Sequence, residues 1–170
     1  RSKRQQTLRA LIDWSHDLLT AGERALFRRL SVFAGGWTLE AAEAMAAGGD
    51  VDHADVLDLL TRLVEKSLVA PDADGSRFRF LETIREYANE QLILSDEEAA
   101  VRMRHLNWYL ALFEAGRPNL IGPEQATWLA RLDVERENLF AAHRYCDHAP
   151  GGVHEWTARV AWIDRGVGLQ

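Results

Sequence analysis

Cysteine is almost absent from this chain: 170 residues include one, Cys146, and only four prolines. A single cysteine cannot form an internal disulfide, which excludes a disulfide scaffold and indicates a reducing, cytoplasmic compartment. No apolar run approaches the roughly 18 residues that span a membrane, so we expect no membrane contact. No glycine pair precedes the Lys-Ser/Thr that phosphate cradling requires. We therefore expect this chain to bind no nucleotide or other cofactor by itself.

Basic residues are also in deficit. Twenty Lys and Arg stand against 26 Asp and Glu, a net charge of −6. This balance argues against DNA contact over the whole surface and leaves room only for a local basic patch. The proportions of hydrophobic residues (47%) and charged residues (27%) are ordinary for one large or two small globular domains. The chain has no initiator Met, and we expect it to be an excised piece of a longer protein.

Helical spacing of apolar residues dominates what is present. The first predicted helix carries on one face Leu8, Leu11, Ile12, Leu18 and Leu19. Thr20 and Glu23 have the spacing of a capping box, which predicts a second helix that runs to Gly35-Gly36. A third helix is predicted from Thr38 to about residue 47.

A fourth helix is predicted over residues 52–66, with Asp52 as its N-cap. The period then changes: residues 67–70 and 77–81 are predicted strands, joined by a segment of turn-forming residues. Helix resumes at Glu82. This order predicts a mostly α fold, with a winged-helix domain and its small β-hairpin wing in residues 1–94.

Residues 95–170 are predicted to be helical throughout. Ser95 and Glu98 have the spacing of a second capping box, and Pro123 fits the first position of a helix that recurs for about five turns. A last helix is predicted over residues 154–165. We interpret this half as the start of a TPR-like helical array.

Three motifs in the right order resemble a known family. They are DWSHDLL at residues 13–19, ERALFRRLSVFAGGWTLEAA at 23–42 and LETIREYA at 81–88. Together they resemble the winged-helix segment of bacterial STAND ATPases, the NB-ARC-like regulators of LuxR, AfsR/SARP and cyclase-linked type. Residues 128–139 are similar to the first helices of the TPR-like array that follows it.

The resemblance implies a role in a molecular switch. In such proteins an upstream P-loop ATPase module, which binds ATP and ADP, packs on the winged helix, and the helical array senses a protein or ligand. The wing-to-helix junction then lies near the nucleotide. Here Leu81 replaces the histidine that contacts phosphate in NB-ARC relatives and cannot donate a hydrogen bond to it. Glu82 keeps the acidic position, and we add Arg85 to this junction.

The recognition helix of a winged helix usually enters the major groove of DNA. In residues 52–66 four acidic side chains oppose two basic ones, and Asp72 and Asp74 lie in the predicted wing tip. This charge favours protein packing over DNA contact. The side chains that could contact DNA or a neighbouring domain are Arg24, Arg28, Arg29, Arg62, Lys66, Arg77 and Arg79.

No catalytic or metal constellation is predicted, so we expect no enzyme in this chain. Ser15, His16 and Asp17 are consecutive on a helix and cannot align as a catalytic triad. The His and Cys residues at 143–148 lack the second ligand pair of a zinc site.

We predict that this chain is a relay segment of a STAND-type transcriptional regulator, coupling nucleotide state to the sensor array by intramolecular packing. Two alternatives stay open: a DNA-binding winged helix, and a protein-interaction scaffold in residues 95–170.

Overall fold

The computed structural model describes residues 3–46 and 48–146. The chain divides into two compact units, Arg1–Val101 and Arg102–Gln170, which we call unit 1 and unit 2. The predicted helix over residues 154–165 lies outside the described residues.

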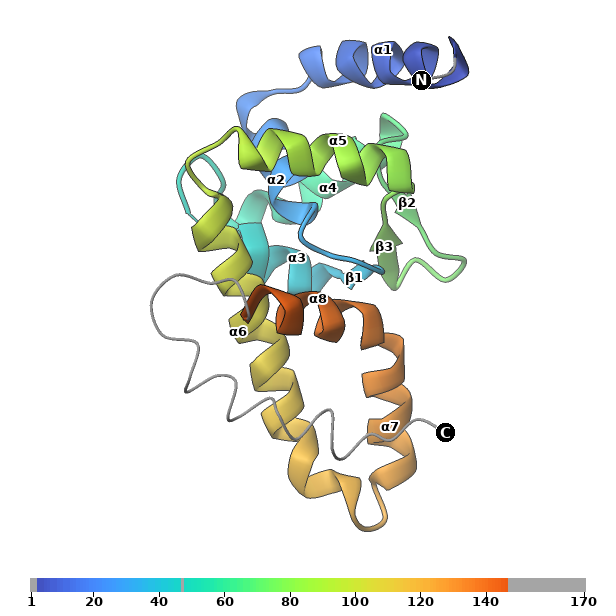
Figure 1. The fold of residues 1–170 in the computed structure, drawn as a ribbon, viewed down its shortest axis with the longest axis vertical. Helices are drawn as coiled ribbons and strands as arrows, with labels where there is room; N and C mark the ends of the chain where they lie inside the picture. Colours follow the sequence, from blue (N-terminus) through green and yellow to red (C-terminus); the bar gives the residue numbers. More distant parts are fainter. Residues whose placement is uncertain (1–2, 47, 147–170) are drawn as a thin grey trace. The chain divides into compact units, whose positions relative to one another are not determined.

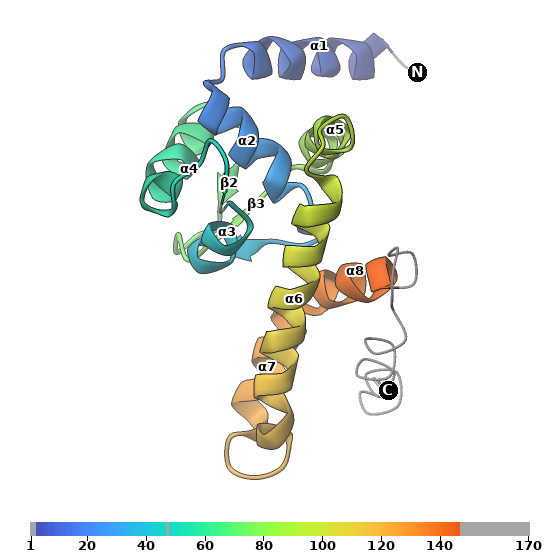
Figure 2. The same ribbon diagram turned by 90° about the vertical axis from the view of Figure 1, so that its left-hand side faces the viewer.

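Unit 1 is a winged helix with one helix before it and one after it (Figure 1). Its elements are α1 (Lys3–Asp17), α2 (Ala21–Leu30), β1 (Trp37–Thr38), α3 (Leu39–Ala46), η1 (His53–Asp55), α4 (Val56–Glu65), β2 (Ala70–Pro71), β3 (Arg77–Arg79) and α5 (Glu82–Ile93). The start of α6 (Glu98–Gly116) also belongs to it. α2 packs against α3, α4 and α5, and Figure 2 shows it lying between α4 and α5.

The three short strands form one antiparallel sheet in the order β1-β3-β2. Trp37 is paired with Phe78, and Ala70 with Arg79. Between sheet and helices lies an aromatic cluster: the Trp37 ring is 5.3 Å from that of Phe33 and 5.0 Å from that of Phe80. Each such ring pair adds about 0.5–1.5 kcal/mol beyond its burial. This cluster fixes the wing against α2.

The Thr20 capping box is confirmed: the Thr20 side chain accepts from the amide of Glu23, and Glu23 accepts from the amide of Thr20. The predicted end of that helix at Gly35-Gly36 is wrong. The helix ends at Leu30, where the Ser31 hydroxyl donates to the Arg28 carbonyl at 2.7 Å. The chain turns early because Phe33 and Trp37 are both buried in the core.

The fourth helix and the hairpin also differ from their predicted bounds. Asp52 makes no side-chain capping bond, and a 3₁₀ turn precedes α4, which begins at Val56. Residues 67–69 are not a strand, because Ser67 takes a left-handed φ of 59° and turns the chain directly after α4. β2 therefore begins only at Ala70.

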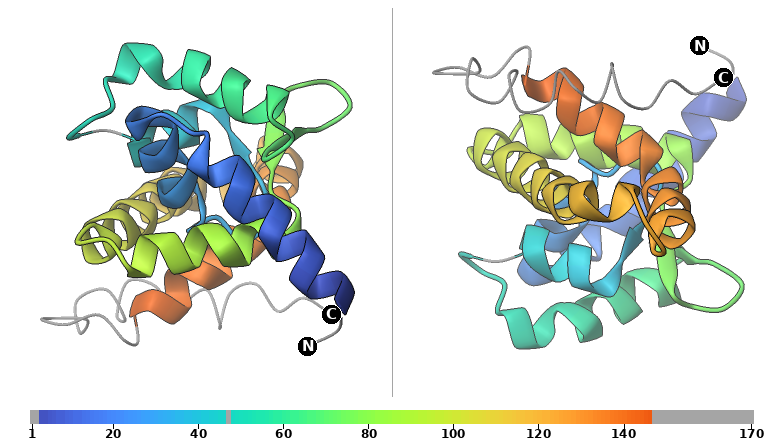
Figure 3. Two further views of the ribbon diagram at one scale, coloured as in Figure 1. Left: turned by 90° about the horizontal axis from the view of Figure 1, so that it is seen from above. Right: turned by 90° about the horizontal axis from the view of Figure 1, so that it is seen from below.

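α1 lies on the outside of unit 1, beside α5 (Figures 1 and 3). Ile12 and Leu19 are buried beneath it, each 5% exposed. The prediction that these five apolar residues lie on one face of a single helix is wrong, because α1 ends at Asp17, before Leu18 and Leu19, and because Leu8 and Leu11 are exposed whereas Ile12 is buried.

Unit 2 contains the rest of α6, then η2 (Arg117–Leu120), α7 (Gln125–Val134) and α8 (Arg136–Cys146). Figure 1 shows α7 running in the opposite direction to α6 after the turn that joins them. α7 begins two residues after Pro123, not at it. The single helix of about five turns predicted here is wrong, because it breaks at Glu135 into α7 and α8.

Candidate DNA and protein interface

The basic cluster on α2 is part of the framework of unit 1. Arg24 donates to the carbonyl oxygens of His16, at 3.3 Å, and Asp17, at 2.8 Å. These carbonyls end α1, where the helix dipole favours a cation. Arg24 thus ties α1 to α2, and its guanidinium is engaged inside the fold.

Arg28 and Arg29 share one carboxylate, that of Glu97. Arg28 donates to it at 2.8 Å and Arg29 through two nitrogens. Arg29 also donates to the carbonyls of Ala46 and Gly48, and its side chain is only 2% exposed. The two guanidinium groups hold the pKa of Glu97 down to about 2. Arg29 therefore cannot reach a DNA phosphate.

Lys66 has a similar internal role at the end of α4. Its ammonium donates at 2.7 Å to the carboxylate of Glu23, which is 1% exposed. Burial opposes ionisation of this carboxylate, but the hydrogen bonds from Lys66 and the Thr20 amide outweigh it and lower the pKa of Glu23. The pair locks the end of α4 onto the start of α2.

The two arginines of the wing, Arg77 and Arg79, have different surroundings. Arg77 donates to the carbonyl of Gly36 at 3.0 Å and so helps join β3 to β1. Arg79 is exposed. At the tip, Asp72 accepts from the Arg77 amide and Asp74 from the Ser76 amide. Two carboxylates therefore hold the turn at the wing tip, and their negative charge opposes contact with a phosphate.

The outer side of α4 is acidic around one apolar residue. Asp55, Asp58 and Glu65 are exposed there, and Leu57 is 50% exposed. Arg62 is also exposed on this helix. Of the seven basic side chains singled out in the sequence, Arg62 and Arg79 are the two that are exposed and for which no internal bond is described.

The wing-to-helix junction is a surface feature. Leu81 is 57% exposed and precedes α5 without a side-chain capping bond. Glu82 and Arg85 pair with each other, with nitrogen–oxygen distances of 2.7 and 3.1 Å, and this pair lowers the pKa of Glu82. Leu81 is the apolar centre of the junction, with a charged pair beside it.

A groove of about 380 Å³ runs between α1 and α5. Arg9 crosses it to the carboxylate of Glu90 at 3.1 Å and lies 5.5 Å from the Tyr87 ring centre. Burial, with a hydrogen bond to Asp13, raises the pKa of Tyr87 to about 12. The Arg9–Glu90 pair and the Tyr87–Asp13 hydrogen bond thus hold α1 beside α5.

The histidine, cysteine and acidic residues of the types found in catalytic and metal sites form no metal-binding group in the part of the chain that the structure describes. His16 packs against the rings of Phe27 and Tyr87, and burial lowers its pKa. Over residues 3–46 and 48–146 there is no group of three His, Cys, Asp or Glu that could hold a metal. Cys146 is buried, and residues 147 and 148 lie outside the described residues.

Unit 2 contains a buried polar cluster that the sequence analysis missed. The Glu135 carboxylate accepts from the Tyr109 hydroxyl at 3.1 Å and from the Asn138 amide at 3.0 Å. Burial lowers the pKa of His105, whose ring lies 4.8 Å from that of Tyr109, to about 4. A nearby recess between α6 and α8 has about 10 Å³, room for one water at most. The scaffold interpretation, which needs a groove in this half, stays a prediction.

Glu97 and Glu23 were also missed as functional partners of the arginines and Lys66. The sequence indicates only a helix-capping role for these residues. Glu23 closes a capping box, and Glu97 lies two residues after Ser95, whose hydroxyl accepts from the Glu97 amide at 3.3 Å. Nothing in local spacing points from either carboxylate to a cation 43 or 68 residues away.

Residues 19–93 match the family model of the winged helix-turn-helix domain. Proteins of Mycobacterium tuberculosis and Mycobacterium bovis, both named as putative HTH-type transcriptional regulators, are 51% identical over 142 residues, which is 82% of this chain. An uncharacterised protein of Mycobacterium tuberculosis is 41% identical over 104 residues, 59% of this chain and 26% of that protein. The chain spans about one sixth of the length of the regulators, 16%. No solved structure matches.

The chain thus contains a winged helix-turn-helix domain and is homologous to proteins named as transcriptional regulators. No helix among the described residues is long and apolar enough to cross a membrane.

Proposed function

We propose that this chain is the winged helix-turn-helix segment of a transcriptional regulator and that it contacts DNA through α4 and the wing. The match over residues 19–93 carries this proposal, together with 51% identity to proteins named as HTH-type regulators. The connectivity α2-β1-α3-α4-β2-β3 supports it, because it leaves the outer side of α4 exposed, as a recognition helix requires.

The charges of this surface set the expected strength of the contact. Arg62 and Arg79 supply exposed cations, whereas the ammonium of Lys66 is held by the buried carboxylate of Glu23. Two phosphate contacts correspond to a slope of about −1.8 for log K against log salt. Acidic side chains beside Arg62 weaken the contact further, so we expect modest affinity and a shallow salt dependence.

Fluorescence anisotropy with a labelled DNA duplex tests the proposal, at about 50 and 200 mM salt, the range over which phosphate contacts are screened. We expect binding that falls between the two salts and is weakened by Arg62→Ala and by Arg79→Ala. Arg85→Ala is the matched control, because Arg85 lies on α5 and pairs with Glu82. Absence of binding at both salts would contradict DNA contact.

A second candidate is favoured by the acidic outer side of α4 and by the internal use of Arg24, Arg28 and Arg29. In this mode the winged helix packs against protein and relays a signal within a longer regulator. A nucleotide-binding module of the same polypeptide, carrying ATP or ADP, is the partner that the sequence resemblance implies. The names of the relatives mention transcriptional regulation and do not mention such a module.

The exposed junction residue Leu81 provides the test of this relay. Leu81→Asp in a full-length regulator is expected to alter its response to ATP and ADP, while leaving DNA binding by the present chain unchanged. Ile93→Asp is the control, because Ile93 is similarly exposed, at 52%, and lies at the other end of α5. An unchanged nucleotide response in the Leu81 variant rejects the junction as a relay surface.

A further inference from the structure

Glu23 is a buried carboxylate at the start of α2 that bonds beyond its own helix. Its side chain is 1% exposed and accepts from the Lys66 ammonium at 2.7 Å and from the Thr20 amide at 2.9 Å. Burial opposes its ionisation, but the hydrogen bonds from Lys66 and the Thr20 amide outweigh burial and lower the pKa of Glu23. Glu23 is therefore negatively charged at neutral pH, and it neutralises the charge of Lys66.

Lys66 lies on the side of α4 that carries the exposed Arg62. The Lys66 amide donates to the Arg62 carbonyl at 3.1 Å, so the helical turn continues as far as Lys66. Residues four apart lie on the same side of a helix, which places Lys66 one turn beyond Arg62 on the surface proposed to contact DNA. The Lys66 side chain is 36% exposed, so the surface is within its reach while its ammonium is bonded inward to Glu23.

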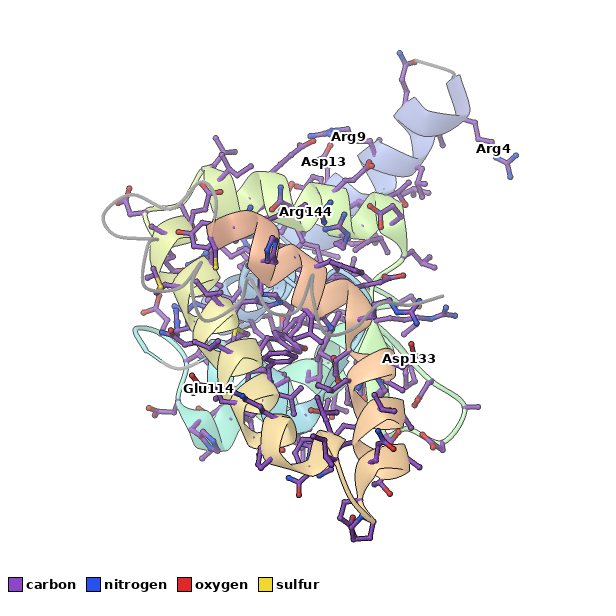
Figure 4. All side chains as sticks on the ribbon, turned by 60° about the horizontal axis from the view of Figure 1, so that its bottom comes forward. Arg4, Arg9, Asp13, Glu114, Asp133 and Arg144 are labelled. Carbon is purple, nitrogen blue, oxygen red and sulfur yellow. The ribbon has the colours of Figure 1, made fainter. Side chains whose placement is uncertain are left out.

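Other cations of unit 1 are placed or bonded elsewhere. Figure 4 shows Arg4 and Arg9 on α1, which lies beside α5 and not on α4. The three arginines of α2 bond to carbonyls and carboxylates inside the fold. Lys66 is therefore the cation whose release would add directly to Arg62 and Arg79.

We propose that Glu23 limits the affinity of this chain for DNA by holding the Lys66 ammonium away from phosphate. This inference rests on the proposed function, because it concerns the same contact through α4 and the wing. Affinity and its salt dependence follow the number of phosphates that cations neutralise. Lys66, already neutralised by Glu23, does not add to that number. Glu23 is thus a positioning residue that acts through Lys66 and keeps the phosphate contacts at two instead of three.

Glu23→Gln removes the charge that holds Lys66 and keeps the helix cap, because glutamine serves as well as glutamate at this position of a capping box. Fluorescence anisotropy with a labelled DNA duplex measures the effect. With a third contact, the slope of log K against log salt steepens from about −1.8 to about −2.7. Between 50 and 200 mM salt the affinity then falls about 40-fold instead of about 12-fold. At the lower salt we expect tighter binding than in the wild type, whereas loss of a purely structural bond would weaken binding.

Two further variants show whether the gain acts through Lys66. Lys66→Gln, added to Glu23→Gln, is expected to return both the affinity and the salt slope to their wild-type values. Glu86→Gln is the matched control for net charge, because Glu86 is an exposed acidic residue of α5, which lies across α2 from α4 (Figure 2). We expect its slope to stay near −1.8. Circular dichroism checks the fold of each variant.

The outcomes separate this inference from the proposed function. If the wild type binds DNA and Glu23→Gln binds equally or less tightly, or if the gain survives Lys66→Gln, the inference is overturned and the DNA contact stands. If neither the wild type nor any variant binds, the proposed function is overturned and this inference with it. Should Glu23→Gln fail to fold, Lys66→Met in the wild-type background decides. We expect it to bind DNA as the wild type does, and a loss as large as that of Arg62→Ala overturns the inference.

Discussion

At the scale of single residues, Glu97 joins several elements of unit 1. Its carboxylate accepts from Arg28 on one side and Arg29 on the other, and Arg29 reaches on to the carbonyls of Ala46 and Gly48. One acidic side chain after α5 thereby joins α2, the end of α3 and the following turn. Its loss leaves a buried guanidinium without a counter-charge, which is costly.

We predict that Glu97→Gln lowers the free energy of unfolding of unit 1 by about 2 kcal/mol, because Arg29 is buried while Glu97 itself is partly exposed. Urea denaturation followed by circular dichroism measures this change. Asp96→Asn is the control: Asp96 is the exposed neighbour, and we expect less than about 0.5 kcal/mol. Equal effects of the two substitutions would contradict a stabilising role for the contacts of Glu97 with Arg28 and Arg29.

The same carboxylate predicts a dependence of stability on pH. The pKa of Glu97 falls from 4.5 to about 2 on folding, worth about 3 kcal/mol at full strength and about 2 after allowance for its exposure. A carboxylate with a lowered pKa stabilises the fold above its unfolded pKa and loses that contribution as pH falls through the folded one. Urea midpoints should therefore decline between pH 4.5 and 2, and decline less in Glu97→Gln.

At the scale of elements, the β1–β3 contact depends on a position without a side chain. A Cβ at Gly36 would lie 2.9 Å from the carbonyl oxygen of Phe78, closer than atoms of this kind approach. The pairing of Trp37 with Phe78 holds the wing in this position, so neither strand can move away freely.

We predict that Gly36→Ala destabilises unit 1 by about 1–3 kcal/mol, the usual cost of overpacking. Gly22→Ala is the control, because its Cβ would meet the flexible Leu59 side chain at 3.4 Å and the Asp50 carbonyl oxygen at an ordinary 3.7 Å, and alanine favours the helix. Thermal melting should show a lower midpoint for the first variant and an unchanged or higher one for the second. A Gly36 variant as stable as the wild type would show that the strands can separate.

The break between α7 and α8 is maintained by a buried polar cluster. Glu135 is 9% exposed, Asn138 1% and His105 3%. His105, with a pKa lowered by burial to about 4, is neutral in the fold at neutral pH. A histidine with a lowered pKa costs stability as pH falls from its unfolded value near 6.5 toward 4, because the unfolded chain then binds the extra proton.

We predict that the ring protons of His105 titrate near pH 4 in a nuclear magnetic resonance experiment, about 2.5 pH units below an unperturbed histidine. The same titration of the chain unfolded in urea is the reference. Titration of His105 near pH 6.5 would mean that its ring is reached by water and that the cluster is not closed.

At the scale of the whole molecule, the division into two units predicts independent energetics. Glu97 lies in unit 1 and Asn138 in unit 2, and they share no described partner. We predict that Glu97→Gln and Asn138→Ala have additive effects within about 0.5 kcal/mol, because the two residues belong to different units and share no described partner. Urea denaturation of the two single variants and the double variant measures this. A larger deviation would show coupling between the units.

The winged helix, its element order and the Thr20 cap were predictable, because they depend on residues close together in the sequence. Periodicity, capping pairs and turn residues are local signals. The strand β1 was missed because two residues carry no periodicity. The true end of α2 depends on the burial of Phe33 and Trp37, and the bounds of α4 depend on the 3₁₀ turn before it and the left-handed Ser67 after it.

The roles of the charged residues were decided by tertiary structure alone. Arg24, Arg28 and Arg29 form a basic cluster in the sequence, yet each bonds to a carbonyl or carboxylate inside the fold. Arg28 and Arg29 meet Glu97, which lies 69 and 68 residues further along the chain, and Arg24 bonds to the last carbonyls of the preceding helix. The sequence by itself determined the composition, the helices and the winged-helix order. Only the folded chain decided which cations remain at the surface, because charge pairing depends on distance in space.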